Sequence, residues 1–220
     1  TRQQRAAMKL RDHDGKIARH HAHVLNEIPF VDEWSGNDKI KELAEKLANF
    51  DGMEEVVPPK GLLTDLRDYQ QQGLNWLNFL QSYGFGGILA DDMGLGKTIQ
   101  ALSMMQIMHE RGELEKPIMV VCPTSLVGNW RNEAAKFCPD LKVLVLHGSE
   151  RHKHFNELND YNLVITTYPL IHRDIEEIDY QYQWVILDEA QVIKNPKAKM
   201  TQAVKQLKAQ HKLCLTGTPM

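Results

Sequence analysis

From residue 62 onward, short apolar runs alternate with stretches of helical periodicity, and this alternation constrains the fold more than any other feature. The runs are short and bounded by turns, as expected of strands buried on both faces. Strands that alternate with helices predict an α/β fold with a mostly parallel sheet flanked by helices. The predicted strands are Gly87–Ala90, Ile118–Cys122, Val143–Leu146, Leu163–Thr167, Trp184–Leu187 and Leu213–Leu215.

Four stretches have the apolar spacing of helices, and methionines of the second are expected to fill its core. For the last helix we predict Asn195 as the cap and Pro196 in the first turn. The predicted helices are Arg67–Gln81, Thr98–His109, Asn129–Phe137 and Pro196–Lys208; the methionines are Met104, Met105 and Met108.

Residues 1–60 lack this alternation, and we expect a mostly helical accessory segment before a domain at 61–220. Ile40, Leu43 and Leu47 recur at helical spacing. Two prolines and a glycine in Val57–Gly61 predict an irregular linker. The chain opens on Thr1 and stops shortly after a distinctive motif, so we expect it to be part of a longer protein.

Composition excludes several classes of protein. With 42% hydrophobic and 25% charged residues, the chain has no apolar stretch long enough for a membrane span, and no charged-then-apolar pattern at its start leads us to expect secretion. Three widely spaced cysteines favour reduced thiols and an intracellular location, in the cytoplasm or nucleoid if the protein is bacterial. The net charge of −3 means that any nucleic-acid binding must come from a local patch.

A glycine-rich turn joins the first predicted strand to the second predicted helix. Gly94 and Gly96 let backbone N–H groups converge on an anion, and the helix N-terminus favours negative charge. Lys97 is then placed to reach the β and γ phosphates of a nucleotide, and the Thr98 hydroxyl to hold Mg²⁺. The common pattern has glycine where this chain has Asp91, so a turn that binds nothing is the alternative.

Two acids, Asp188 and Glu189, follow the apolar run Trp184–Leu187. The carboxyl ends of strands in such a sheet are where ligands bind. Asp188 is placed to hold Mg²⁺, and Glu189 to orient and deprotonate an attacking water. Taken alone, the pair could simply cap the next turn. Together with the glycine-rich turn it supplies a cradle, a metal site and a positioned water, as phosphoryl transfer requires.

Four segments, in this order, resemble the successive motifs of the SNF2 branch of helicase superfamily 2, of bacterial type. Asp91 in the glycine-rich turn is typical of that branch. The resemblance implies the first RecA-like lobe of an ATP-driven motor that moves on double-stranded DNA, with ATP and Mg²⁺ as cofactors and the second lobe outside this chain. The segments are Leu66–Leu77, Ile88–Thr98, Asp188–Asn195 and Leu215–Pro219.

The resemblance also assigns roles to individual residues. Gln70 is similar to the glutamine that reads adenine, because its amide donates and accepts at once. Lys97, Asp188 and Glu189 are implied to be catalytic, with Thr98 and Asp188 at the metal. The implied nucleotide-binding residues are Gln70, Asp91, Asp92, Met93, Gly94, Leu95, Gly96, Lys97 and Thr98.

Further segments resemble those that touch DNA or couple it to the nucleotide. Thr124, Ser125 and Thr167 lie in such DNA-contact segments, and Lys194 begins a lysine-rich stretch without acids, which is either a DNA contact or a solvated face. Gln191 stands where histidine is more usual, so we expect altered coupling rather than lost hydrolysis. The implied coupling residues are Gln191, Thr216, Gly217 and Thr218.

Two rival functions fit parts of the pattern. One is a non-catalytic, nucleotide-gated platform that docks a protein partner through residues 1–60. The other is a DEAD-box RNA helicase, which Pro123–Leu126 and Ile193–Asn195 fit poorly. Two histidine groups, at 20–23 and 147–154, are favoured as solvated side chains over metal ligands. The resemblance favours ATP binding with poor hydrolysis by this chain alone.

Overall fold

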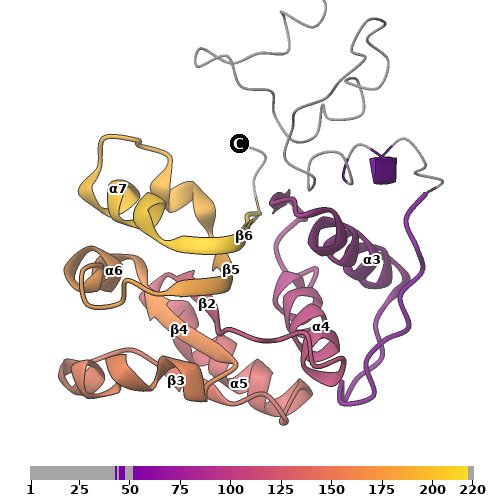
Figure 1. Ribbon diagram of the computed structural model, residues 1–220, viewed down its shortest axis with the longest axis horizontal. Coiled ribbons are helices and arrows are strands. Elements are labelled where there is room, and N and C mark those ends of the chain that lie inside the picture. The colour runs from indigo at the N-terminus through magenta and orange to yellow at the C-terminus, as the bar shows by residue number, and fades with distance from the viewer. Residues whose placement is uncertain (1–42, 44, 48–51, 218–220) are drawn as a thin grey trace, which may run out of the picture. The chain divides into compact units, whose positions relative to one another are not determined.

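The computed structural model describes residues 43, 45–47 and 52–217 (Figure 1). The chain divides into two compact units, Thr1–Met53 and Glu54–Met220. The division falls before the boundary predicted near residue 60. In the first unit, residues 43 and 45–47 are helical, and most of the predicted accessory segment lies outside the described residues.

The second unit is built on a six-stranded sheet in which every neighbouring pair of strands is parallel. The strand order is β1-β6-β5-β2-β4-β3. All six predicted runs are strands, so the predicted parallel α/β fold is confirmed. The strands are β1 (Gly87–Leu89), β2 (Ile118–Cys122), β3 (Val143–Val145), β4 (Leu163–Thr167), β5 (Gln181–Leu187) and β6 (Lys208–Leu215).

In the described part of the second unit, α3 precedes the sheet, and four further α-helices and three 3₁₀ segments connect its strands. The four predicted helices are present, whereas α6 and η3 were not predicted. The elements are α3 (Asp68–Tyr83), α4 (Lys97–Glu110), η2 (Thr124–Leu126), α5 (Val127–Phe137), η3 (Ser149–Asp160), α6 (Tyr168–Asp174), η4 (Ala190–Ile193) and α7 (Lys199–Gln206).

The predicted start of the last helix was wrong. Ala198, not Asn195, is the N-cap of α7. The Asn195 side-chain oxygen instead accepts a hydrogen bond from the Lys197 amide at 3.0 Å, which closes a turn before the helix. The helix also ends earlier than predicted, because Lys208 already pairs with β5 as the first residue of β6.

Each face of the sheet carries its own apolar core. Along β2, Ile118, Val120 and Cys122 pack with side chains of α3, α4 and α5, while Met119 and Val121 pack with side chains of α6 and α7. Figure 1 shows these two groups of helices on opposite sides of the strands. Helix α4 is buried on all sides from residue 99 to 108, including the three methionines predicted to fill the core.

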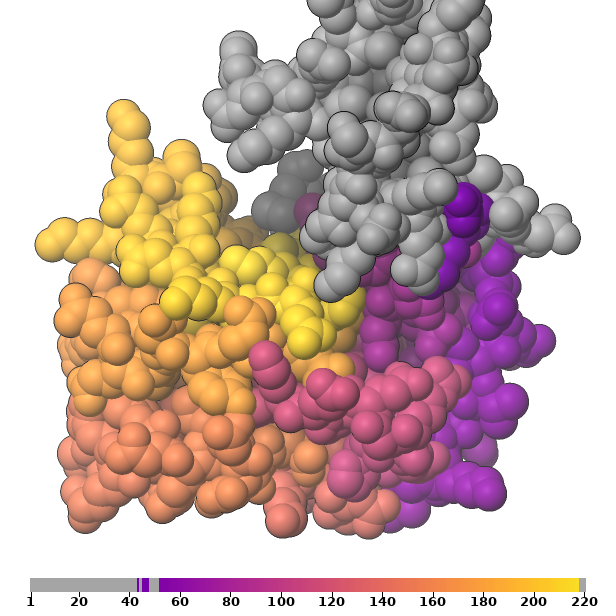
Figure 2. Space-filling view, in the orientation of Figure 1, coloured from indigo at the N-terminus to yellow at the C-terminus, as the bar shows by residue number. Residues whose placement is uncertain are grey.

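The predicted linker is irregular in structure but is bound to the lobe. The Glu110 carboxylate accepts hydrogen bonds from the backbone amides of Lys60, at 3.1 Å, and Gly61, at 2.6 Å. The Val56 amide donates to the Asn75 side chain at 2.9 Å. In Figure 2 the indigo and purple atoms of this segment and of α3 cover one flank of the lobe. The segment therefore leads directly into the structure around α3.

Gly86 precedes the edge strand β1, which carries the chain to the glycine-rich turn. A Cβ at this position would lie 2.6 Å from the backbone carbonyl oxygen of Lys212 on β6, and a backbone atom cannot swing aside. We predict that Gly86→Ala lowers the free energy of unfolding by about 1–3 kcal/mol, as overpacking does. Urea denaturation of the two proteins measures the difference.

Gly128 provides the matched control, because a Cβ there meets nothing within 4 Å and the residue lies in α5. Gly128→Ala should leave stability unchanged or raise it by about 0.5–1 kcal/mol. Equal stabilities of the two alanine variants would contradict the close approach of β1 to β6.

Candidate nucleotide-binding site

Three groups of predicted site residues follow strands that end at the same edge of the sheet. The glycine-rich turn follows β1, the acid pair follows β5, and Thr216 and Gly217 follow β6, which lies between the other two strands. The Thr216 amide donates to the Leu89 carbonyl oxygen at 3.1 Å, which ties the end of β6 to the end of β1. Segments far apart in the sequence therefore meet at one edge.

The glycine-rich turn wraps around the ammonium group of Lys97. Gly94 and Gly96 have φ values of 82° and 78°, in the left-handed region that glycine adopts without strain. Lys97 donates to the carbonyl oxygens of Asp91 at 2.7 Å and Asp92 at 3.0 Å. A positive charge thus lies inside the turn at the N-terminus of α4, where an anion is favoured.

Asp91 occupies the position where the common phosphate-loop pattern has glycine. Among the described residues other than glycine, only Glu189 has a positive φ, so the backbone at 91 accepts a side chain without strain. The Asp91 carboxylate accepts a hydrogen bond from the Gln100 side chain at 3.2 Å, which ties the turn to buried α4. The departure from the common pattern is therefore compatible with a phosphate-binding turn.

Asp188 is buried, with 7% of its surface exposed. One carboxylate oxygen accepts a hydrogen bond from the Trp130 indole N–H at 2.8 Å, and the other accepts one from the Glu189 amide at 2.9 Å. Burial raises the pKa of Asp188, while these two hydrogen bonds and the positive charge of Lys97 act to lower it. The charge of Lys97 thus favours the ionised form of this carboxylate, against the effect of burial.

Glu189 connects the acid pair to the end of β6. Its φ of 50° is in the left-handed region, which is uncommon for a residue other than glycine. The Gln191 amide group donates to the Glu189 carboxylate, and the Thr216 hydroxyl donates to the Gln191 side-chain oxygen at 3.0 Å. The structure thus brings together three of the residues expected to act in coupling and catalysis.

The remaining coupling residues lie nearby or beyond the described part of the chain. A Cβ at Gly217 would lie 2.7 Å from Met93 Cγ in the glycine-rich turn, so a side chain there would displace Met93. Met93 itself is 78% exposed. Thr218 lies outside the described residues.

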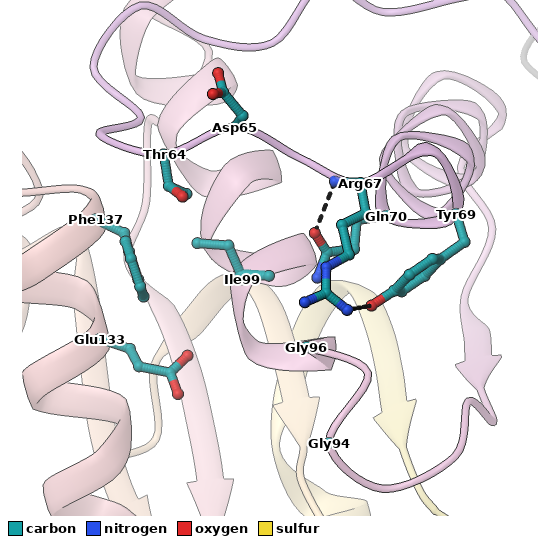
Figure 3. Close-up of a pocket in the computed structure, with 10 residues that line it drawn as sticks. All are labelled: Thr64, Asp65, Arg67, Tyr69, Gln70, Gly94, Gly96, Ile99, Glu133 and Phe137. Atoms are coloured by element: carbon teal, nitrogen blue, oxygen red, sulfur yellow. Dashed lines mark hydrogen bonds between the residues drawn. The ribbon is translucent and has the colours of Figure 1, made fainter.

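A pocket of about 290 Å³ adjoins the glycine-rich turn (Figure 3). Gln70 lines it, and its side chain accepts from the Arg67 amide at 3.0 Å and donates to the Leu95 carbonyl oxygen at 3.2 Å. The pocket is lined by Thr64, Asp65, Arg67, Tyr69, Gln70, Gly94, Gly96, Ile99, Glu133 and Phe137.

Sequence reasoning missed most of this lining. Figure 3 shows Glu133 and Phe137 of α5 across the pocket from Arg67 and Gln70. Helix α5 reaches the pocket only through tertiary packing, so no local pattern points to Glu133 or Phe137. Tyr69 adjoins Gln70 in the motif that carries the family resemblance, and that adjacency was the available signal.

The residues expected at DNA differ in their accessibility. Thr124 and Ser125 are exposed in η2, directly after β2, and Lys194 is exposed after η4. Thr167 is only 1% exposed at the end of β4. Neighbouring groups therefore cover the Thr167 side chain, and its contact with DNA stays a prediction.

A Mg²⁺ ion fits the donor set at this edge. Magnesium is usually bound by one or two carboxylates together with substrate phosphates. Asp188 has two lone-pair sites left after its two N–H donors are counted, and Thr98 is partly exposed in the first turn of α4. Thr98 and Asp188 are thus the residues that would hold the ion against the phosphates.

The second histidine group does not form a common centre. His152 lies 3.6 Å from the Glu177 carboxylate, and His154 lies 2.8 Å from that of Glu157. The first group, at residues 20–23, lies outside the described residues. Within the described part of the chain, no helix has the length and apolar character needed to cross a membrane.

Three features define a RecA-like P-loop nucleotide-binding lobe. They are a parallel sheet with helices on both faces, a glycine-rich turn after one strand and an acid pair after another. The model of the SNF2-related domain family matches residues 69–220. The chain therefore belongs to the SNF2 family of helicase-like ATPases, of which it contains the first lobe.

Relatives and solved structures agree with this membership. The chain is 40% identical over 186 residues to the putative ATP-dependent helicase/translocase YwqA of Bacillus subtilis. The aligned region covers 83% of this chain and 20% of YwqA. It is 37% identical over 197 residues to the TATA-binding protein-associated factor mot1 of Schizosaccharomyces pombe. This aligned region covers 83% of this chain and 10% of mot1. The chain thus spans a fifth or less of these two relatives.

A solved Sulfolobus solfataricus SWI2/SNF2 ATPase core in complex with double-stranded DNA matches with a TM-score of 0.71 and 39% identity, over 76% of this chain and 34% of that one. The core domain from the same organism matches with a TM-score of 0.67 and 37% identity, over 77% and 34%.

Lys97 is the charged centre of the turn, and its ammonium is expected to exchange the carbonyl oxygens of Asp91 and Asp92 for phosphate oxygens. We predict that Lys97→Ala weakens ATP binding by about 1.5–3 kcal/mol, the range for a hydrogen bond to a charged group. Isothermal titration calorimetry measures it. Lys205, an exposed lysine of α7, serves as the control: Lys205→Ala should bind ATP as the wild type does. Unchanged affinity in Lys97→Ala would contradict the placement of the phosphates.

Proposed function

We propose that this chain is the ATP-binding lobe of a DNA-dependent ATPase that couples hydrolysis to movement along duplex DNA and to the remodelling of protein–DNA complexes. One observation carries the proposal. The turn that holds the Lys97 ammonium follows β1, and buried Asp188 with Glu189 beside it follows β5, at the same edge of the sheet on either side of β6. This is the combination of charges that a metal-bound triphosphate needs.

The geometry suggests how a nucleotide is divided among these groups. The pocket beside Gln70 would take the adenine, and the amides of the turn with Lys97 would take the β and γ phosphates. Thr98 and Asp188 would hold a Mg²⁺ ion, which would supply positive charge to the phosphate oxygens. Glu189 would orient the attacking water and accept its proton.

Glu189 also favours an enzyme over a nucleotide-gated binding platform. A switch needs phosphate binding but no acid that activates water. In this chain the carboxylate is held by Gln191, which is itself held by Thr216 at the end of β6. A carboxylate held in place at this edge is what hydrolysis requires. Docking of a protein partner through residues 1–60 remains a separate proposal.

Duplex DNA is the proposed track. The archaeal core that this lobe resembles was solved with double-stranded DNA. Exposed Thr124 and Ser125 follow β2 at the same sheet edge as the nucleotide site. Six lysines and no acids follow Glu189, so this part of a chain with a net charge of −3 is locally positive. Lys194 is the member nearest the acid pair in sequence.

We expect this chain alone to bind ATP and to hydrolyse it slowly. It matches 34% of the archaeal ATPase core. In phosphoryl transfer an arginine supplied from elsewhere stabilises the transition-state charge and accelerates hydrolysis by several orders of magnitude. Hydrolysis should therefore be measured in a protein that carries both lobes. An intracellular location is part of the same proposal, since DNA is the partner.

Glu189→Gln tests the proposed role of the second acid. In a protein with both lobes, we predict that this variant keeps ATP binding but loses turnover stimulated by duplex DNA by about 100-fold or more, the scale of general-base catalysis. The substitution keeps the side chain's shape and removes its basicity. Steady-state phosphate release measures the loss, and Glu115→Gln, an exposed acid before β2, is the matched control. Full turnover in Glu189→Gln would remove this residue from the mechanism.

The nature of the track separates this proposal from an RNA helicase. We predict that duplex DNA stimulates ATP hydrolysis by the two-lobe protein and that single-stranded RNA of equal length does not. The contact with phosphates depends on local positive charge, so stimulation should decline as salt rises. Stronger activation by RNA than by duplex DNA would contradict the proposed track.

A further inference from the structure

Two fully buried aromatic residues each place a single hydrogen-bond donor on Asp188. The Trp130 indole N–H donates to the carboxylate at 2.8 Å, and the Tyr168 hydroxyl donates to the backbone carbonyl oxygen of Asp188 at 2.6 Å. Trp130 is 0% exposed and Tyr168 is 1% exposed. Water therefore does not compete with either donor.

The two donors approach from opposite faces of the sheet. Trp130 lies in α5 and packs with the core that contains α3 and α4 side chains. Tyr168 is the first residue of α6 and packs with the core that contains α7 side chains. Asp188, at the end of β5, is therefore held from both sides of the sheet, on its side chain by one core and on its backbone by the other.

Both donors belong to elements that leave the sheet next to one another. Cys122 at the end of β2 pairs in register with Thr167 at the end of β4. The chain runs from Cys122 through η2 into α5, and from Thr167 directly into α6. The position of Asp188 is thus fixed by two helices whose starts are themselves anchored to neighbouring strands.

We propose that Trp130 and Tyr168 are positioning residues that hold the Asp188 carboxylate in the orientation that binds Mg²⁺. This inference deepens the proposed function and rests on it, since it assumes that Asp188 is the metal-binding acid. Neither residue reaches the reacting atoms. Their action is exerted entirely through Asp188.

The physical reason lies in the burial of the carboxylate. Removing the indole donor leaves one buried carboxylate oxygen without its partner, so the group is free to rotate toward another donor. Partners that orient a metal ligand change metal affinity by about 10- to 100-fold when they are removed. The hydroxyl of Tyr168 acts on the backbone of Asp188 through a neutral hydrogen bond. Its loss is expected to change metal affinity by about 2- to 10-fold.

The chain contains a matched control for each donor. Trp184 is also 0% exposed, but its indole N–H has no hydrogen-bond partner among the described residues. Tyr182 is 0% exposed, and its hydroxyl donates to the Ile178 carbonyl oxygen at 3.3 Å, away from Asp188. Trp184→Phe and Tyr182→Phe therefore remove the same atoms from the core without touching the proposed metal ligand.

The test measures binding of a non-hydrolysable ATP analogue to the 220-residue chain by calorimetry, once with Mg²⁺ and once with EDTA. The ratio of the two affinities is the magnesium increment. We predict that Trp130→Phe lowers this increment about 10-fold or more and Tyr168→Phe about 2- to 10-fold. Both variants should keep the affinity measured in EDTA, because the phosphate and adenine contacts do not involve these residues.

The controls separate positioning from general loss of packing. Trp184→Phe and Tyr182→Phe should keep the wild-type increment, even where their melting temperatures fall as far as those of the donor variants. An unchanged increment in Trp130→Phe, or an equal loss in Trp184→Phe, would overturn the inference. A wild-type chain that binds the analogue in neither condition would instead overturn the proposed function.

Discussion

A parallel sheet places the carboxyl ends of all its strands at one edge, and the site depends on this constraint. In this lobe β6 lies between β1 and β5, and the backbone hydrogen bond from Thr216 to Leu89 joins two of these ends. The glycine-rich turn and the acid pair, about ninety residues apart in sequence, are thereby brought to opposite sides of one strand. A reversed β6 would instead carry Thr216 and Gly217 to the opposite edge, away from both motifs.

The electrostatics of the site follow from this convergence. A carboxylate as buried as Asp188 is destabilised in its charged form, and burial accordingly raises its pKa. Two N–H donors and the charge of Lys97 offset part of that penalty. Lys97 in turn is bound by two backbone carbonyl oxygens. Each charge is partly satisfied: phosphates would complement Lys97, and a cation bound to those phosphates would complement Asp188.

The arrangement of the acid pair also explains why its two members differ. Asp188 is fixed by donors from α5 and α6, whereas Glu189 has a left-handed backbone, and its carboxylate accepts a hydrogen bond from the side chain of Gln191. The fixed carboxylate of Asp188 suits a metal ligand. The carboxylate of Glu189 is connected through the Gln191 amide to Thr216, which suits a group that responds to changes at the end of β6. Glutamine at 191 preserves a hydrogen-bonding link at this position.

Much of the fold was predictable because apolar runs such as Ile118–Cys122 are short and buried on both faces. The first halves of β5 and β6 were not predicted, because they are polar and so lack the apolar run of a buried strand. Their first residues, Gln181 and Lys208, are exposed and pair with each other. Helix α6 is short and begins with Tyr-Pro, which gives too few residues for a periodic pattern.

The residues of the glycine-rich turn and acid pair were found from sequence because each occupies a contiguous motif. The pocket lining at Glu133 and Phe137, the cap of α7 and the burial of Thr167 depend on packing between distant segments. The donors Trp130 and Tyr168 are of the same kind: Trp130 follows a segment that the sequence singled out and Tyr168 lies within another, but only the fold shows that both meet Asp188.

The most direct measurement is a crystal structure of this chain with Mg²⁺ and a non-hydrolysable ATP analogue. The account predicts phosphates on Lys97 and the amides of the glycine-rich turn, with the metal between Thr98 and Asp188. A metal bound away from Asp188, or phosphates bound at another edge of the sheet, would contradict it.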